Sequence, residues 1–473
     1  MSDLSPTLWW VRRDLRLSDN PALSLACESG GPVIPVFVHD EVVAGLGAAP
    51  KWRLMLGLDA LARQITARKS RLILRRGRAL DVLRDLIRET GAAAVFWGRA
   101  YDPAGVARDK EVKAALKQDG IEARSAPGHL LFEPWNVETG EGGFYKVYTP
   151  FWKAVRTRSV PEPRPAPGGL PSPGRWPETE ELESWRMGDA IRRGAGVVAG
   201  HVAVGEEAAR GRLGGFIAHR IADYADRRNF PAAEGTSRLS ENLTYGEISP
   251  HACWHAALRA MDEGKRGAET FLKELVWREF AYHLLWHTPQ IATGNWREGW
   301  DAFPWSEDDS TPEVTAWKRG RTGIPFVDAA MREMYVTGTM HNRARMIVAS
   351  WLTKNLMTHW RIGLKWFEDH LIDWDPASNA LGWQWTAGSG PDAAPYFRIF
   401  NPVTQREKFD PDEAYVDTWI AEGRAAPSKA ALSYFEAIPA SWGLSPRDPY
   451  PAPIADPGES RKRALAAYEA RTF

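Results

Sequence analysis

Short apolar runs alternate with segments of helical periodicity along the first 130 residues of the chain. Residues 33–39 form an almost continuous apolar run, which is typical of a strand buried on both faces. Residues 51–69 instead repeat leucine and isoleucine at helical spacing. The pattern predicts strands at 8–11, 33–39, 72–74, 94–97 and 121–125, and helices at 51–69, 80–89 and 104–118. This order predicts an α/β fold with an open, parallel, Rossmann-like sheet and right-handed crossovers.

The first strand is followed by a helix start rather than by a phosphate-binding turn. Asp19-Asn20-Pro21 combines a good helix cap with a proline suited to the first helical turn. No GxGxxG motif follows the strand, which argues against a dinucleotide bound at that turn.

A proline-rich segment separates this region from a helical one. Residues 161–177 hold seven prolines and three glycines, which indicates an unpacked linker. We therefore expect an α/β domain at 1–130, a linker at 131–197 and a helical domain at 198–473. The tail from Pro427 is expected to wrap the surface. The predicted helices of the last domain are 200–226, 249–262, 268–287, 325–336, 340–357, 361–371 and 376–385.

Composition excludes several classes of protein. Lys and Arg total 60, as do Asp and Glu, so a wholly basic nucleic-acid binder is excluded, although a local basic groove is not. Two cysteines are too few for a disulfide scaffold or a four-cysteine metal site. No apolar run approaches the ~20 residues of a membrane span, and residues 1–7 are polar, so a cytoplasmic protein is expected.

Tryptophan is unusually frequent, with 23 in the chain and twelve of them between Trp277 and Trp385. These tryptophans could simply fill a large helical core. Tryptophan also stacks well on bases and flavins, so the clustering equally favours binding of an aromatic ligand.

Three segments carry polar groups at helical spacing. Glu274, Trp277 and Arg278 share one helix face, which suits a base-like ligand with a phosphate or, alternatively, an ion pair beside a core tryptophan. Asn342 and Met346 share another face. Arg343 and Arg345 lie between these two residues and need acidic partners, which Asp373 and Asp375 could supply. The alternative is that they form ordinary ion pairs on the surface. In the third segment Asp375-Pro376 indicates a helix start, with Asn379 and Trp383 one turn apart.

A loop at 235–243 offers hydroxyls, backbone amides and one cation. Such a loop suits a pyrophosphate, although the pattern alone is weak.

Taken together and in this order, the motifs resemble the photolyase/cryptochrome flavoprotein family over nearly the whole chain. The segments 147–152 and 375–379 are similar to the bacterial class III cyclobutane pyrimidine dimer photolyases in particular. The motifs that carry the resemblance are WVRRDLRLSDN at 10–20, TSRLS at 236–240, WREF at 277–280, MHNR at 340–343, GWQW at 382–385 and FRIFNP at 397–402.

The resemblance implies one FAD in the helical domain, active in its reduced form. Thr236 to Ser240 and Tyr224 would hold its pyrophosphate and ribityl region, Arg345 would pair with Asp373, and Asn379 would face flavin N5. The implied FAD-binding residues are Tyr224, Thr236, Ser237, Arg238, Leu239, Ser240, Phe271, Glu274, Arg278, Asn342, Arg345, Asp373, Asp375 and Asn379. Trp383, Trp360 and Trp305 match the family's electron chain from flavin to surface, where the alternative for each is a core tryptophan.

The resemblance also implies light-driven repair of cyclobutane pyrimidine dimers in DNA, without a metal. Glu274, Asn342, Met346 and Asn379 would be the catalytic residues. Asn342 and Met346 stand where the (6-4) branch has His, and His341 is expected to face a different side, so that branch is disfavoured. The residues expected to contact the flipped dimer or the DNA are Glu274, Trp277, Arg278, Asn342, Arg343, Met346, Trp385, Arg398, Arg228 and Lys408.

Two further expectations follow from the resemblance. Glu41 and Trp52 could clasp a methenyltetrahydrofolate antenna in the α/β domain, against an empty or differently filled domain. The alternative function is a cryptochrome-type blue-light photoreceptor that signals through a protein partner, and a plain nucleotide-binding protein is a remote one. We expect a monomer, because no heptad repeat is visible.

Overall fold

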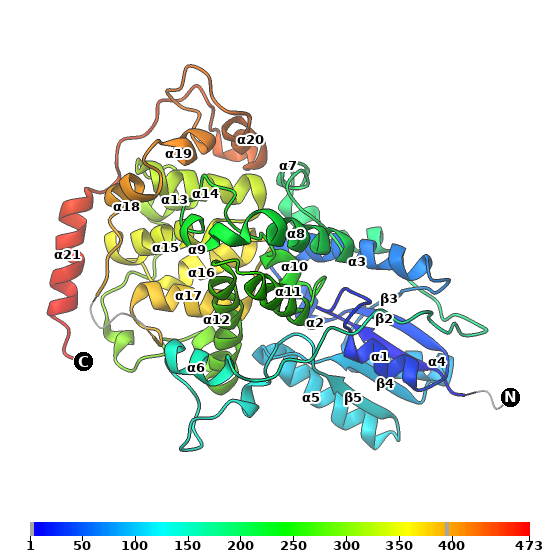
Figure 1. Cartoon of the computed structure of the whole chain (residues 1–473). Coiled ribbons are helices and arrows are strands. Elements are labelled where there is room, and N and C mark those ends of the chain that lie inside the picture. The colour runs from blue at the N-terminus through cyan, green and yellow to red at the C-terminus, as the bar shows by residue number, and fades with distance from the viewer. Residues whose placement is uncertain (1–3, 393–396) are drawn as a thin grey trace.

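The computed structural model describes residues 4–392 and 397–473 and has two lobes (Figure 1). Residues 1–3, part of the polar start on which the expectation of a cytoplasmic protein partly rests, and residues 393–396 lie outside the described residues. The N-terminal lobe contains a parallel sheet of order β3-β2-β1-β4-β5. The strands are β1 (Thr7–Val11), β2 (Val33–His39), β3 (Ile73–Arg76), β4 (Ala94–Gly98) and β5 (Glu122–Ala126). The predicted α/β fold and parallel sheet are confirmed.

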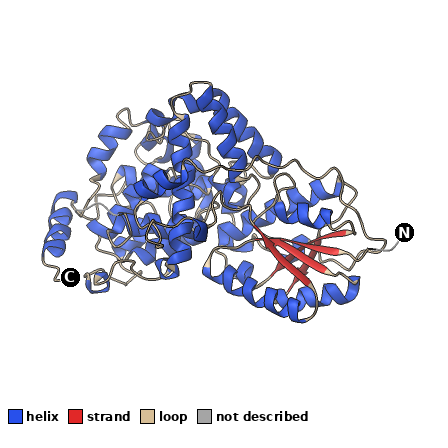
Figure 2. Ribbon diagram, turned by 60° about the horizontal axis from the view of Figure 1, so that its bottom comes forward, coloured by secondary structure: helices blue, strands red, loops and turns tan. Residues whose placement is uncertain are grey.

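Helices cover both faces of the sheet because its strands are apolar on both sides (Figure 2). Trp9 packs with α1 and α3, whereas Trp10 packs with α4 and α5 on the opposite face. The predicted start of α1 is present, since the Asn20 side chain accepts a hydrogen bond from the Leu23 amide at 3.1 Å. The helices of this lobe are α1 (Pro21–Glu28), α2 (Glu41–Ala44), α3 (Ala48–Thr66), α4 (Ala79–Thr90) and α5 (Pro103–Gln118).

The proline-rich segment 161–177 packs along the α/β lobe, so the prediction of an unpacked linker is wrong. The Pro171 carbonyl accepts a hydrogen bond from the Val33 amide at 2.7 Å, and the Arg164 carbonyl accepts one from Asp19 at 2.8 Å. Leu170 is buried among the core residues of the sheet. Proline has no backbone N–H to donate to a sheet, so this segment adds no strand. Its carbonyls can still accept hydrogen bonds, and its leucine can still be buried against the sheet.

The second lobe is helical, as predicted. Its longest helix is α12, whose bounds match the predicted 268–287. The helices are α6 (Tyr148–Val155), α7 (Gly194–Val198), α8 (Glu206–His219), α9 (Tyr224–Arg227), α10 (Ser240–Thr244), α11 (Pro250–Asp262), α12 (Ala268–His287), α13 (Pro312–Lys318), α14 (Pro325–Thr337), α15 (Asn342–Ser350), α16 (Trp360–His370), α17 (Pro376–Ala387), α18 (Pro402–Phe409), α19 (Ala414–Trp419), α20 (Lys429–Ala437) and α21 (Pro457–Glu469).

Two predicted helices of this lobe are interrupted. In the region 200–226, α8 begins only after Gly205, whose φ is 93°, and a 3₁₀ turn over Ile221–Asp223 separates it from α9. The region 340–357 contains α15 followed by a π-helical turn over Trp351–Asn355. Such turns often occur at functional sites.

The tail from Pro427 is only partly a surface segment. In α20, Tyr434 is fully buried and its hydroxyl donates a hydrogen bond to the Arg319 carbonyl at 2.6 Å. This part of the expectation is wrong, since α20 contributes to the core. The last helix, α21, lies at the edge of the molecule (Figure 1). Within residues 4–392 and 397–473, no helix is long and apolar enough to cross a membrane.

Candidate active site

The helical lobe encloses a cavity of about 990 Å³. Its walls come from α12, α15, α17 and α19, from the loop 231–240, and from Arg212 of α8. Most of the residues singled out in the sequence line it. Those residues are Arg228, Thr236, Ser237, Arg238, Leu239, Ser240, Glu274, Trp277, Arg278, Asn342, Arg345, Met346, Asp373, Asn379, Trp383 and Trp385.

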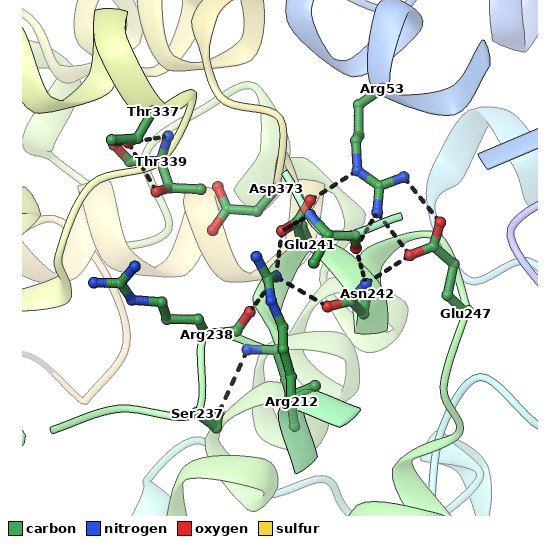
Figure 3. A network of polar contacts seen from close by, with 12 residues as sticks. Arg53, Arg212, Ser237, Arg238, Glu241, Asn242, Glu247, Thr337, Thr339 and Asp373 are labelled. Carbon is green, nitrogen blue, oxygen red and sulfur yellow. Dashed lines mark hydrogen bonds and ion pairs between the residues drawn. The ribbon is translucent and has the colours of Figure 1, made fainter. Parts of the chain in front are cut away.

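At one end of the cavity the loop 236–240 offers hydroxyls and a single cation, and Figure 3 shows its Ser237 and Arg238 beside Arg212. Arg238 adopts φ of 53°, which turns the chain sharply before α10 begins at Ser240. Gly235 is needed beside it, because a Cβ there would lie 2.7 Å from the Arg227 carbonyl oxygen. The bend presents Thr236, Ser237 and Ser240 to the cavity together.

Arg212 lies at the same end, and the sequence analysis missed it. Its Nη1 donates hydrogen bonds to the Arg238 carbonyl at 2.8 Å and to Asn242 Oδ1 at 3.1 Å, and it also pairs with Glu241. No motif includes Arg212, so only its place on α8, opposite the loop, reveals it.

The middle of the cavity holds the expected pair of Arg345 and Asp373. Arg345 Nη2 lies 2.9 and 2.7 Å from the two carboxylate oxygens of Asp373, which is buried. The pair fixes a carboxylate at the cavity wall with its charge compensated.

Asp375 does not line the cavity, unlike the other residues of its segment. It caps α17 by accepting a hydrogen bond from the Ser378 amide at 2.7 Å, and it accepts another from the Tyr282 hydroxyl at 2.5 Å. Its carbonyl accepts the Asn379 side-chain N–H at 2.9 Å. Asp375 thus positions Asn379, and its own expected contact with the flavin stays a prediction.

Tyr224 and Phe271 do not line the cavity either. They pack against Phe216, with ring centroids 5.3 Å and 4.8 Å from it. Both are buried, and they form an aromatic layer in the lobe's core. The contact with the cofactor that is expected of these two residues stays a prediction.

Glu274 faces the cavity and forms an ion pair with Arg228. Burial raises the pKa of Glu274, while Arg228 opposes that shift. Trp277 also lines the cavity and stacks on Tyr148, with ring centroids 3.7 Å apart and planes within 4°. Trp385 is held by a hydrogen bond from its Nε1 to the Asp392 carbonyl at 2.9 Å. A carboxylate and two rigid indoles thus occupy one wall.

The guanidinium of Arg278 binds other residues of the protein. Nη1 donates to the His129 carbonyl and Nη2 contacts His129 Nε2, both at 2.8 Å, and Glu279 provides the nearest carboxylate at 3.3 Å. The expected role of Arg278 in holding DNA phosphates is therefore not supported, although its side chain lines the cavity.

The segment 340–346 lines the cavity with Asn342, Arg345 and Met346, which were expected there, and also with Met340 and His341. Asn342 lines it and is exposed. His341 lines it too, which corrects the expectation that it faces elsewhere. His341 Nδ1 accepts the Arg343 amide at 3.1 Å. Its Nε2 is buried, and burial, followed by the charges of Arg343 and Arg345, lowers the pKa of His341 to about 4.

Cations gather beside the cavity. Arg343 bonds Asn229 Oδ1 at 2.5 Å and lies 4.3 Å from the Phe409 ring centroid. Lys408 lies 5.3 Å from the same centroid. Burial, followed by the charges of Arg228 and Arg398, lowers the pKa of Arg343, so these three arginines lie close together. The cluster is suited to a polyanion.

Trp383, Trp360 and Trp305 are all buried near the cavity. The Trp383 ring lies directly against α16 at Gly363, where an added Cβ would lie 2.0 Å from the ring. Trp360 begins the same helix. The His359 ring bridges the other two, with centroids 5.4 Å from Trp360 and 5.2 Å from Trp305.

Glu41 and Trp52 are not brought together as an antenna clasp. Trp52 is buried and packs against Gly188, Val198 and Ile372. Glu41 is exposed and contacts the Ala79 amide at 3.4 Å. The indole therefore offers no open face to a pterin. In residues 4–392 and 397–473, no group of three or more His, Cys, Asp or Glu could hold a metal ion.

The cavity fits FAD by its donor set. Hydroxyls and guanidiniums at one end suit a pyrophosphate, the compensated Asp373 and the free Asn379 oxygen suit polar flavin atoms, and Trp383 and Phe367 provide an apolar wall.

Comparisons with known proteins give the same result. A family model described as the FAD binding domain of DNA photolyase matches residues 271–470, and one described as DNA photolyase matches residues 7–168. A deoxyribodipyrimidine photo-lyase of Agrobacterium fabrum is 46% identical over 471 residues, covering 98% of each chain. The crystal structure of a bacterial class III photolyase from Agrobacterium tumefaciens superimposes with a TM-score of 0.91 at 46% identity, covering 99% of this chain and 98% of that one. An archaeal photolyase from Sulfolobus tokodaii, crystallised with two FAD molecules, has a TM-score of 0.79 at 27% identity and covers 98% of this chain and 99% of that one.

Proposed function

This chain belongs to the DNA photolyase family, and from that premise we propose that it repairs cyclobutane pyrimidine dimers in DNA with light. It is then a deoxyribodipyrimidine photo-lyase with one FAD in the cavity of the helical lobe. When bound, reduced FAD supplies the electron that light transfers to the dimer and that returns after the ring has opened. The remaining work falls to side chains of the chain itself.

The observation that carries the proposal is the wall formed by Glu274, Trp277 and Trp385. The bases of a flipped-out dimer carry no charge and present broad apolar faces. Two indoles can therefore hold the bases by stacking while the sugar-phosphate backbone stays outside the cavity. Trp277 already has its other face covered by Tyr148, which fixes its plane. Asn342 and Met346 line the same cavity and complete the contact surface.

Glu274 would bind the polar edge of the dimer. Burial raises the pKa of its carboxyl while Arg228 opposes the shift, and a carboxyl at this place can hydrogen-bond the pyrimidine edge. Because Arg228 is its ion-pair partner in the absence of substrate, the arginine becomes free for a DNA phosphate when Glu274 turns to the dimer.

Asn379 would face the flavin as a neutral amide. Its N–H is bound to the Asp375 carbonyl at 2.9 Å, which leaves the oxygen to accept a flavin N–H without adding a negative charge. Arg228, Arg343, Arg398 and Lys408 would hold the DNA phosphates around the cavity, so binding would weaken with salt.

Trp383, Trp360 and Trp305 would carry electrons inward to restore reduced flavin. Their burial within one lobe and the bridging His359 ring support this role.

The test uses purified protein with reduced flavin, a thymine-dimer oligonucleotide and blue light, with a dark sample in parallel. We expect light-dependent loss of dimer, and we expect Glu274→Ala to lower the repair yield while FAD stays bound. Glu269→Ala is the matched control, because Glu269 lies on the same helix but is exposed and pairs with Lys273. Equal repair by the Glu274 variant would contradict the assigned wall. Bound flavin without repair in the wild type would favour the photoreceptor alternative.

A further inference from the structure

Arg212 occupies the polar end of the cavity without being fully used by the protein. Its three recorded hydrogen bonds all start from Nη1 and end on Glu241, Asn242 and the Arg238 carbonyl. Among the described residues no partner is recorded for its Nε or Nη2, and its side chain is 19% exposed. Part of a fixed guanidinium therefore remains available at the cavity wall, beside Ser237 and Arg238 (Figure 3).

Glu241 connects this arginine to the other lobe. One carboxylate oxygen of Glu241 pairs with Arg212, and the other accepts a hydrogen bond from Arg53 Nε at 2.8 Å. Arg53 lies on α3 of the α/β lobe and is fully buried. Its two terminal nitrogens bond Glu247 at 2.9 and 2.6 Å.

The network contains as many positive as negative charges. Two arginines face two glutamates, and Asn242 bridges them by donating to Glu247 at 2.6 Å and accepting from Arg212 at 3.1 Å. Because a buried charge that loses its partner is costly, these residues are expected to move together or not at all. The orientation of Arg212 is thus tied to the contact between α10 and α3.

We propose that Arg212 is a further ligand of the FAD pyrophosphate, and that through Glu241 and Arg53 it makes flavin binding and docking of the α/β lobe reinforce each other. An anion at the cavity end holds Arg212, which holds Glu241 against Arg53. Because such coupling is reciprocal, a docked α3 also presents Arg212 in the orientation that binds the anion. The inference rests only on the flavin-binding part of the proposed function.

The first test measures FAD release from the holoprotein in the dark and without DNA, from the rise of flavin fluorescence on dilution. We expect Arg212→Gln to release FAD about 10- to 100-fold faster, as for loss of a charge-assisted hydrogen bond, and Arg212→Lys to lie between it and the wild type. Arg210→Gln is the control, because Arg210 lies on the same helix but pairs with Glu206 and bonds Ser18. Release from Arg212→Gln at the wild-type rate would overturn the proposal.

The second test addresses the coupling. Amide hydrogen exchange of α3 is compared in the holoproteins of the wild type and Arg212→Gln, both saturated with free FAD. Faster exchange in α3 of the variant, with unchanged exchange in α4 and α5, supports the coupling. Equal exchange in α3 would show that Arg212 binds the anion without transmitting to the other lobe and would overturn that half of the proposal. Repair activity enters neither test, so failure of the proposed function would be seen separately.

Discussion

Both lobes bury tryptophan, but they use it differently. In the α/β lobe Trp9, Trp10 and Trp97 are fully buried on the sheet, and among the described residues no hydrogen-bond partner is found for the indole nitrogens of Trp9 and Trp10. In the helical lobe Trp360 and Trp305 donate to Asn295 and to the Thr353 carbonyl, both at 2.8 Å. Pairing of the indole N–H does not by itself separate the lobes, because Trp97 donates to Asp109 at 3.0 Å in the first, while in the described part of the second Trp351 has no recorded partner.

The difference lies in what surrounds the rings. Trp10 and Trp97 pack against each other at 5.6 Å in the core between sheet and helices, where they fill space. Trp383 instead forms part of a cavity wall and meets Phe367 at 5.0 Å. The number of tryptophans thus says little about function, whereas their position relative to a cavity says much. The predictions below separate the two uses.

The largest effect on photoreduction of the flavin is expected for Trp383→Phe. The ring keeps its apolar contacts but loses the easily oxidised indole, so light-driven reduction of oxidised flavin should fall below detection while the fold is retained. Absorbance of the flavin during illumination with an external reductant measures this. Photoreduction at the wild-type rate would place the electron chain elsewhere.

Gly363→Ala should disturb the same ring without changing its chemistry. The added Cβ would lie 2.0 Å from Trp383, so the ring or α16 must move. We expect a loss of ~3 kcal/mol in the free energy of unfolding, as for overpacking of a core, together with slower photoreduction. Gly214→Ala on α8 is the control, since nothing lies within 4 Å of its Cβ. Unchanged photoreduction in Gly363→Ala would mean that the position of Trp383 is not critical.

The lobes should also differ in their response to pH. Beside the cavity, burial raises the pKa of Glu333 from 4.5 to about 7, against hydrogen bonds from Tyr415 and the His341 amide. Between these two values the folded protein holds a proton that the unfolded chain has lost, so stability falls as pH rises, by about 3 kcal/mol. In the α/β lobe burial raises the pKa of Asp109, but Arg12 and Arg108 outweigh it and hold the pKa below its usual range. That contribution is lost only as pH falls.

Denaturant unfolding of the holoprotein at pH 5 and pH 7.5 checks this contrast. Glu333→Gln should lose stability less steeply than the wild type over this interval, because its side chain does not titrate. Glu279, whose pKa burial also raises to about 7, remains in both proteins and cancels in the comparison. Parallel curves for the two proteins would show that Glu333 ionises with an ordinary pKa.

The smallest effect is expected for Trp97→Phe. The change removes the hydrogen bond from Trp97 Nε1 to Asp109 Oδ2 at 3.0 Å, while Arg12 and Arg108 still bind that carboxylate. We expect a cost of ~1 kcal/mol in the free energy of unfolding and no change in photoreduction. A marked effect on photoreduction would break the distinction drawn between the two lobes.

Local patterns in the sequence predicted most of the fold. The strands are apolar on both faces, and the cap at Asn20 and the bounds of α12 depend on neighbouring residues, so they could be predicted. The helix expected at 340–357 was only half right, since its π-helical turn depends on packing rather than on propensity. Leu170 shows the same limit, because a proline-rich segment can still bury one leucine against a sheet.

The candidate site divides in the same way. Its loop 236–240 and the pair of Arg345 and Asp373 stand out in the sequence and meet in one cavity. Asp375 was assigned to the cofactor, yet it caps α17, because a carboxylate before a proline has a competing local use. Arg278 was assigned to DNA, yet it binds His129, a residue 149 positions earlier in the chain.

By itself the sequence determined the two kinds of lobe, the identity of the family and the residue types of a flavin cavity. These follow from periodicity and from motifs, which are properties of short stretches of chain. Only the tertiary structure decided what surrounds each side chain and which groups it contacts. It buried Trp52, brought His341 into the cavity and joined Arg212 through Glu241 to Arg53. Arg53 and Glu241 are 188 positions apart, and their pairing depends on how whole lobes dock, which no local pattern encodes.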